Sequence, residues 1–168
     1  DYMLSALDMK IINKQNREFI FKTILQPIID SEKYDYVIID TCPFLGLLNY
    51  NILVASDYVL IPVELSAFGI EGLEPLSNFI DEVKINNDKL EILGIVETKV
   101  DNRESTTEET RSLLRELFSS KIMKSSIPVD INIKKSQFVG QPICDFAPSS
   151  RAALWYLELA KEVDLIVD

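Results

Sequence analysis

The stretch that constrains this chain most is the run Val37–Ile39, which ends in the carboxylate of Asp40. Its residues are β-branched and continuous, a pattern that predicts a central parallel strand covered on both faces. The carboxylate would then lie at the carboxyl end of the strand, where open α/β sheets bind their ligands. Pro43 and Gly46 follow closely and predict a tight loop. Asp40 is therefore the first candidate for chemistry.

An apolar strand that ends in Asp is also the pattern of a Walker B element. The carboxylate of such an element holds Mg²⁺ through a water molecule beside a nucleotide phosphate. A second interpretation is open, because Asp also begins turns after purely structural strands. The two interpretations of Asp40 predict the same strand and differ only in what the carboxylate binds.

The composition excludes several classes of site. The chain has 168 residues, 47% of them hydrophobic, which is enough for a core and predicts a single domain over residues 1–168. It has no histidine, which excludes Ser-His and Cys-His catalysis and the commonest zinc sites. Cys42 and Cys144 are far apart and belong to no CxxC pair, as expected in a reducing compartment. No apolar run is long enough to span a bilayer, so we expect a cytoplasmic protein without membrane contact.

The net charge of −10 argues against binding of polyanions by the whole surface, so a nucleic-acid contact would need a local patch. The charge is unevenly distributed. Residues 99–135 contain eight basic and six acidic residues, a local balance of +2, whereas the remainder carries −12.

Apolar spacing predicts an alternation of helices and strands. Helices are expected over residues 14–30, 47–55, 68–86, 106–119 and 148–163, and further strands over 58–63, 90–96 and 121–127. Residues 131–140 are expected to be irregular or briefly helical. This alternation is typical of an α/β fold, a mostly parallel sheet with helices on both faces.

Five stretches carry distinctive residue patterns in a fixed order. They are YDYVIIDTCPFLG at 34–46, LIPV with F, E, G and L over 60–73, TKVDNR at 98–103, IP to GQPI over 127–143, and PSSRAA to YLELAKE over 148–162. Together they resemble the ParA/Soj partition ATPases, a branch of the deviant Walker P-loop proteins. The resemblance covers Tyr34 to Val163 without large gaps.

The resemblance implies a P-loop NTPase-like fold and an ATP-dependent switch in plasmid or chromosome partitioning. In that family two subunits sandwich two ATP molecules, the homodimer binds DNA without sequence specificity, and a ParB-like partner stimulates hydrolysis. ATP and Mg²⁺ are the cofactors implied for the intact protein, with localisation on the nucleoid. A MinD-like membrane cycler fits less well, because residues 162–168 contain no basic amphipathic helix.

The resemblance also assigns roles to individual residues. Asp40 would be the catalytic carboxylate, close to the attacking water and holding Mg²⁺ through water, in a switch II loop over Thr41–Gly46. The residues expected against the nucleotide are Thr41, Pro43, Pro128, Val129 and Asp130. The residues expected against DNA are Arg103, Lys134 and Lys135. Alternatives are open for some of them, since Pro128 could simply end a strand and the three cations could form a solvated face.

The chain departs from the family pattern in three places. It contains neither G-x-x-x-x-GK[ST] nor KGG-x-x-K-[ST], the loop that cradles the phosphates. We therefore expect the chain to be the C-terminal two-thirds of a ParA-like protein, inactive alone. The family often has arginines at the positions of Val129 and Asn132, and Cys42 replaces the first proline of its usual pair. The alternative function is a non-catalytic interaction module that lacks the P-loop.

Overall fold

The computed structural model describes residues 10–101, 103 and 106–167. By their contacts the residues cluster into two compact units. The first consists of the residues up to Val59 together with Glu74–Glu91, and the second of Leu60–Leu73 together with Ile92 onward. Whether the chain acts as one domain stays a prediction.

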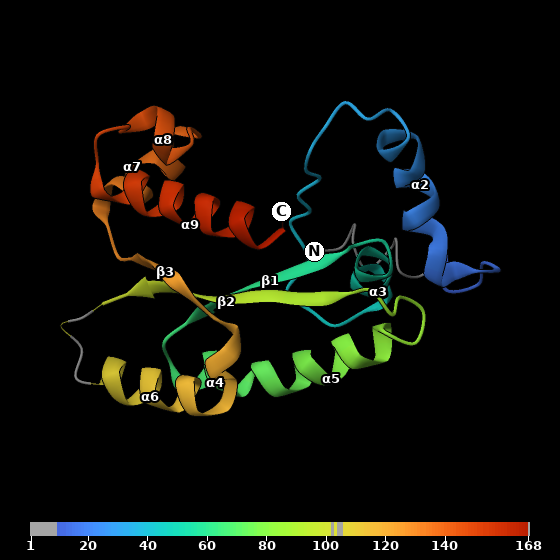
Figure 1. Cartoon of the computed structure of the whole chain (residues 1–168), viewed down its shortest axis with the longest axis horizontal. Helices are drawn as coiled ribbons and strands as arrows, with labels where there is room; N and C mark the ends of the chain where they lie inside the picture. Colours follow the sequence, from blue (N-terminus) through green and yellow to red (C-terminus); the bar gives the residue numbers. More distant parts are fainter. Residues whose placement is uncertain (1–9, 102, 104–105, 168) are drawn as a thin grey trace. The chain divides into compact units, whose positions relative to one another are not determined.

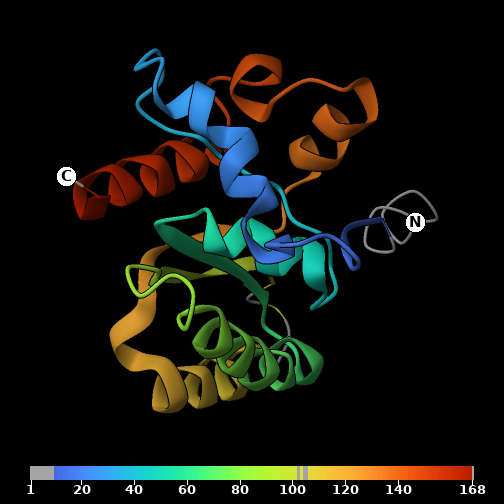
Figure 2. The same ribbon diagram turned by 90° about the vertical axis from the view of Figure 1, so that its right-hand side faces the viewer.

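The first unit is built around helix α3 (Leu47–Val54), whose Ile52, Leu53 and Val54 are buried. The short helix η1 (Arg17–Phe19) and helix α2 (Ile20–Ile29) both pack against α3, as Figure 2 shows for α2. The carboxyl end of α3 is closed by Asn87, whose Nδ2 donates to the carbonyl oxygens of Leu53 and Ser56 at 3.0 and 2.7 Å.

The sheet has three strands, β1 (Tyr58–Glu64), β2 (Glu91–Val100) and β3 (Ile122–Pro128), in the order β1-β2-β3. Strands β2 and β3 pair in parallel. The helices of the second unit are α4 (Ala67–Glu71), α6 (Thr106–Phe118), η2 (Ser119–Lys121), α7 (Ile131–Val139), α8 (Ile143–Phe146) and α9 (Arg151–Val167). Helices α6 and α9 lie on opposite sides of the sheet (Figure 1). This arrangement confirms the predicted α/β class.

Helix α9 packs along β3 and is fixed there by a carboxylate. The Oε1 and Oε2 atoms of Glu162 accept hydrogen bonds from the backbone N–H groups of Lys124 and Ser125, each at 2.7 Å. Two consecutive N–H groups face the same side because β3 is irregular here, between its pairs Ile95–Ile122 and Glu97–Ser126. Glu162 thus supplies acceptors that the β-ladder cannot supply.

The predicted strand over Val37–Ile39 is wrong. Residues 34–43 form neither helix nor strand, and the side chain of Ile38 is 92% exposed. A β-branched run becomes a strand only where a neighbouring strand supplies hydrogen-bond partners and a covered face. None of the three strands in the described part of the chain pairs with these residues.

Three helices also differ from expectation. The helix expected over 68–86 is divided into α4 and α5 (Leu73–Val83) at Gly72, because Pro75 has no N–H to donate to the carbonyl of Glu71. Residues 131–139 form a complete helix, since Asp130 caps its start and Gly140, at φ 67°, ends it. The helix expected over 148–163 is observed as α9 over Arg151–Val167, with Ala152 and Ala153 buried and Leu154 and Leu157 exposed.

Candidate functional site

The loop that follows Asp40 is held against helix α3 by one buried amide. Asn49 is 7% exposed, and its Nδ2 donates to the carbonyl oxygens of Cys42 and Phe44 at 2.7 and 2.8 Å. The N–H of Gly46 also donates to the carbonyl of Phe44, at 3.1 Å. The predicted switch II loop is therefore a defined turn.

Asp40 lies two residues before this turn, and its side chain is exposed. Thr41 and Pro43, expected near the nucleotide, are exposed as well. No residue that the structure describes donates a hydrogen bond to the Asp40 carboxylate. Asp40 is thus accessible to a ligand, whether or not that ligand is a metal.

A single exposed carboxylate fits Mg²⁺ bound mainly through water and phosphate oxygens, the usual arrangement at nucleotide sites. Within residues 10–101, 103 and 106–167, no three acidic, cysteine or histidine side chains gather as a metal-binding group. Asp40 therefore fits a water-mediated role and does not fit an all-protein metal cage.

The carboxyl end of β3 carries the residues expected near adenine and ribose. The N–H of Val129 donates to the carbonyl of Val100 at 3.0 Å, so this N–H is used by the fold. Asp130 caps α7, its Oδ1 accepting from the N–H of Asn132 at 2.7 Å. Pro128 ends the strand and is half-buried. The Val129 N–H and the Asp130 Oδ1 atom are therefore already hydrogen-bonded within the protein.

The three cations expected at DNA differ in their surroundings. Lys134 and Lys135 are exposed on α7. Arg103 is exposed too, but its Nε donates to Asp101 Oδ1 at 2.8 Å and a second guanidinium nitrogen contacts Oδ2. The side chain and backbone N–H of Arg103 hold the pKa of Asp101 down, at about 2. Arg103 is therefore charge-compensated by Asp101.

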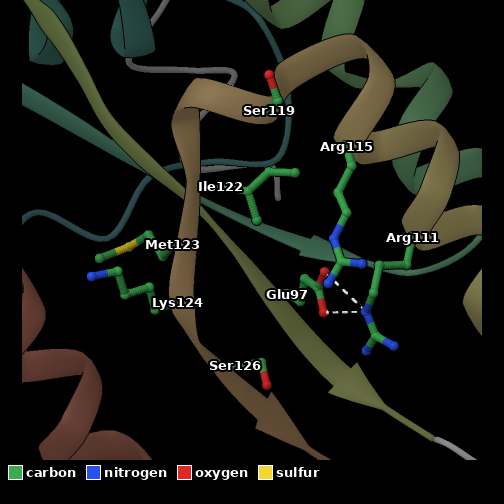
Figure 3. Close-up of a pocket in the computed structure, with 8 residues that line it drawn as sticks. All are labelled: Glu97, Arg111, Arg115, Ser119, Ile122, Met123, Lys124 and Ser126. Atoms are coloured by element: carbon green, nitrogen blue, oxygen red, sulfur yellow. Dashed lines mark hydrogen bonds and ion pairs between the residues drawn. The ribbon is translucent and has the colours of Figure 1, made fainter.

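A cavity of about 470 Å³ lies beside strands β2 and β3 of the second unit. In Figure 3, Arg111 and Arg115 reach from α6 toward Glu97 on β2, while Lys124 points away from them. The Nε of Arg111 donates to both carboxylate oxygens of Glu97, at 3.2 and 3.0 Å, and its side chain is only 15% exposed. This pair, which sequence reasoning missed, compensates the charge of Glu97 within a cavity that Arg115 and Lys124 also line.

Sequence reasoning also missed Asn49. The signal was present, since Asn49 and Asn51 interrupt an otherwise apolar helical run. A polar residue in such a run is most informative when it is buried, and only the structure shows that both are.

The chain is similar to known proteins along most of its length. A family model described as an AAA domain, AAA_31, matches residues 1–92. The chain is 35% identical over 161 residues to the sporulation initiation inhibitor protein Soj of Bacillus subtilis, covering 95% of this chain and 63% of that protein. It is 33% identical over 161 residues to the chromosome partitioning protein ParA of Myxococcus xanthus, covering 95% and 56%.

The solved structures agree on the fold. Cobyrinic acid a,c-diamide synthase from Mycobacterium smegmatis matches 94% of this chain and 57% of its own, with a TM-score of 0.76 and 23% identity. A structure of that synthase holds an ATP analogue and magnesium.

The curated relatives are longer, and the chain spans between 50% and 63% of their lengths. In the described part of the chain, no helix combines the length and apolarity needed to cross a bilayer. The match of the AAA_31 model to more than half of the chain, with the ParA and Soj relatives, identifies the family. The chain belongs to the AAA_31 family, among the ParA-like partition ATPases.

Proposed function

We propose that this chain is part of an ATP-dependent switch that acts in plasmid or chromosome partitioning. The observation that carries the proposal is the exposed Asp40 carboxylate, directly followed by a turn clamped to α3. Bound Mg-ATP would supply the γ-phosphate whose transfer to water drives the switch. Asp40 would hold the metal through water and orient the attacking water. Thr41 and Pro43 would face the nucleotide from the same loop.

The test uses the protein expressed from its complete gene. Asp40→Asn keeps the size of the side chain but removes its charge, so we expect ATP turnover to fall about a hundredfold or more. Asp35→Asn is the matched control, because Asp35 is an exposed aspartate of the same irregular segment. Equal turnover in the two variants would refute the role of Asp40.

The DNA-binding part of the proposal is carried by Lys134 and Lys135, which are adjacent, exposed and outside every ion pair of the described residues. Arg103 would contact DNA as well only if its guanidinium group broke its hydrogen bonds with Asp101. Each phosphate neutralised contributes about −0.9 to the slope of log K against log salt. The double variant Lys134→Gln, Lys135→Gln should therefore reduce the slope by about 2. Lys161→Gln removes the charge of an exposed lysine on α9 and should leave the slope unchanged.

Two further parts of the proposal concern partners. A homodimer that binds DNA would be associated with the nucleoid, and a ParB-like protein would accelerate hydrolysis and release it. Sedimentation of the complete gene product with and without ATP tests the dimer. Nucleotide-independent monomers would contradict the switch.

One observation favours the alternative, a non-catalytic interaction module. Residues 34–38 belong to neither a helix nor a strand, and the large side chains of Tyr34 and Ile38 are strongly exposed. Such a segment can pair with a strand of another protein. A complete gene product that is monomeric, well folded and indifferent to ATP would support this second function over the first.

A further inference from the structure

The orientation of the Asn49 amide follows from its contacts. Its nitrogen lies within 2.8 Å of the carbonyl oxygens of both Cys42 and Phe44. Exchanging nitrogen and oxygen would set three acceptors against one another, so Nδ2 must face the loop. Both donors of the amide are therefore used on one loop.

The oxygen of the same amide has different surroundings from the nitrogen. Asn49 Oδ1 is buried, and no residue that the structure describes donates to it. Buried polar atoms are normally hydrogen-bonded, so an exception calls for an explanation. The clamped loop itself carries backbone N–H groups at Phe44 and Leu45 for which the described residues provide no acceptor.

Asn51 provides the contrast within the same helix. It is also buried, but its Nδ2 donates to the carbonyl of Leu47 at 3.0 Å, and its Oδ1 accepts from the N–H of Phe21 at 3.2 Å. Asn51 thus joins α2 to α3 and does not touch the loop. Helix α3 has one amide for packing and one for the loop after Asp40.

We propose that Asn49 is a positioning residue for Asp40. Its amide nitrogen latches the turn over Cys42–Phe44 to α3 in the conformation seen here, and its free Oδ1 accepts an N–H of the same loop when the loop rearranges. The second half of the statement rests on the proposed function, because nucleotide binding is the event that would rearrange the loop. The latch itself rests only on the contacts of Asn49.

The latch is tested on the 168-residue chain by limited chymotrypsin digestion. Cleavage after Phe44 requires the turn to leave α3, and its rate follows the population of the opened loop. Asn49→Leu keeps the shape of the side chain and removes both donors, so cleavage after Phe44 should accelerate at least about tenfold. Cleavage after Tyr34, which lies outside the turn, should change by less than twofold.

Asn51→Leu is the matched control, since it removes a buried amide from the same helix. It should leave cleavage after Phe44 within twofold of wild type. Equal acceleration in the two variants, or none with Asn49→Leu, would overturn the latch. If either leucine variant fails to fold, Asn49→Ser and Asn51→Ser replace the pair, and Asn49→Ser should then accelerate cleavage after Phe44 clearly more than Asn51→Ser does; equal acceleration would overturn the latch.

The rearrangement is tested on the complete gene product with Mg-ATP. In the wild type, ATP should change the rate of cleavage after Phe44 at least threefold, and Asn49→Leu should abolish that response while Asn51→Leu keeps it. An ATP response that survives Asn49→Leu would overturn the role of Oδ1. A wild type that binds no ATP would refute the proposed function, and the digestion of the 168-residue chain would still decide the latch.

Discussion

Glu162 should contribute a pH-dependent part of the stability of the second unit. Burial alone would raise the pKa of Glu162, but the hydrogen bonds from Ser125 and from the backbone of Lys124 outweigh burial and lower it from 4.5. A carboxylate whose pKa is lowered on folding stabilises the protein above its unfolded pKa. That stabilisation is lost as the pH falls through the folded pKa, so it should be complete at pH 7 and decline below about pH 4.5.

The substitution Glu162→Gln keeps the shape of the side chain. It leaves the backbone N–H of either Lys124 or Ser125 facing an amide NH₂ group, which cannot accept its hydrogen bond. Hydrogen bonds to a charged group contribute about 1.5–3 kcal/mol each, and partial exposure reduces their sum. We expect a loss of about 2 kcal/mol at pH 7. With an m-value of about 2 kcal/mol per M in urea, the unfolding midpoint should fall by about 1 M.

The fluorescence of Trp155, the single tryptophan, provides the measurement, because it lies on α9 and packs against the cluster around Ile143. Glu158→Gln is the control, an exposed glutamate on the same helix, and should shift the midpoint by less than about 0.3 M. The difference between wild type and Glu162→Gln should be nearly constant from pH 7 to about pH 5 and should shrink as the pH falls below about 4.5. A difference that is constant with pH, or as large for Glu158→Gln, would refute the reasoning.

Three further predictions concern other contacts. Glu97→Leu alone would leave Arg111 buried without its main partner and should cost about 3 kcal/mol in urea unfolding, whereas the double variant with Arg111→Leu should recover most of that loss. In an NMR titration the carboxyl of Asp101 should protonate near pH 2, and in Arg103→Ala it should return toward 3.8. Gly140→Ala should cost about 1 kcal/mol by thermal unfolding although no atom blocks its Cβ, because φ at this residue is +67°; Gly140→Asn should cost less.

Local patterns were enough to predict the succession of elements. Strand β1 was expected over 58–63 and observed over Tyr58–Glu64, and α3 was expected over 47–55 and observed over Leu47–Val54. Such elements depend on hydrophobic spacing and on turn residues, which the sequence displays directly. The family followed in the same way, from the order of short motifs.

Local patterns failed to predict the secondary structure where contacts with other parts of the chain, or caps at the ends of an element, decide whether that element forms. The run Val37–Ile39 has the composition of a central strand, but a strand also needs a neighbour, and no described strand pairs with it. Helix α7 was underestimated because its stability comes from the caps at Asp130 and Gly140 more than from any apolar stripe.

The sequence by itself therefore determined the α/β class, the order of most elements and the acidic residue at which to look for chemistry. Only the tertiary structure showed that Asn49 clamps the loop after Asp40, that Arg103 is paired with Asp101, and that Glu162 caps an irregularity in β3. The physical reason is that hydrogen bonds and burial join atoms that are close in space. Periodicity in a sequence reports which face of an element is apolar, but not which polar atom lies opposite.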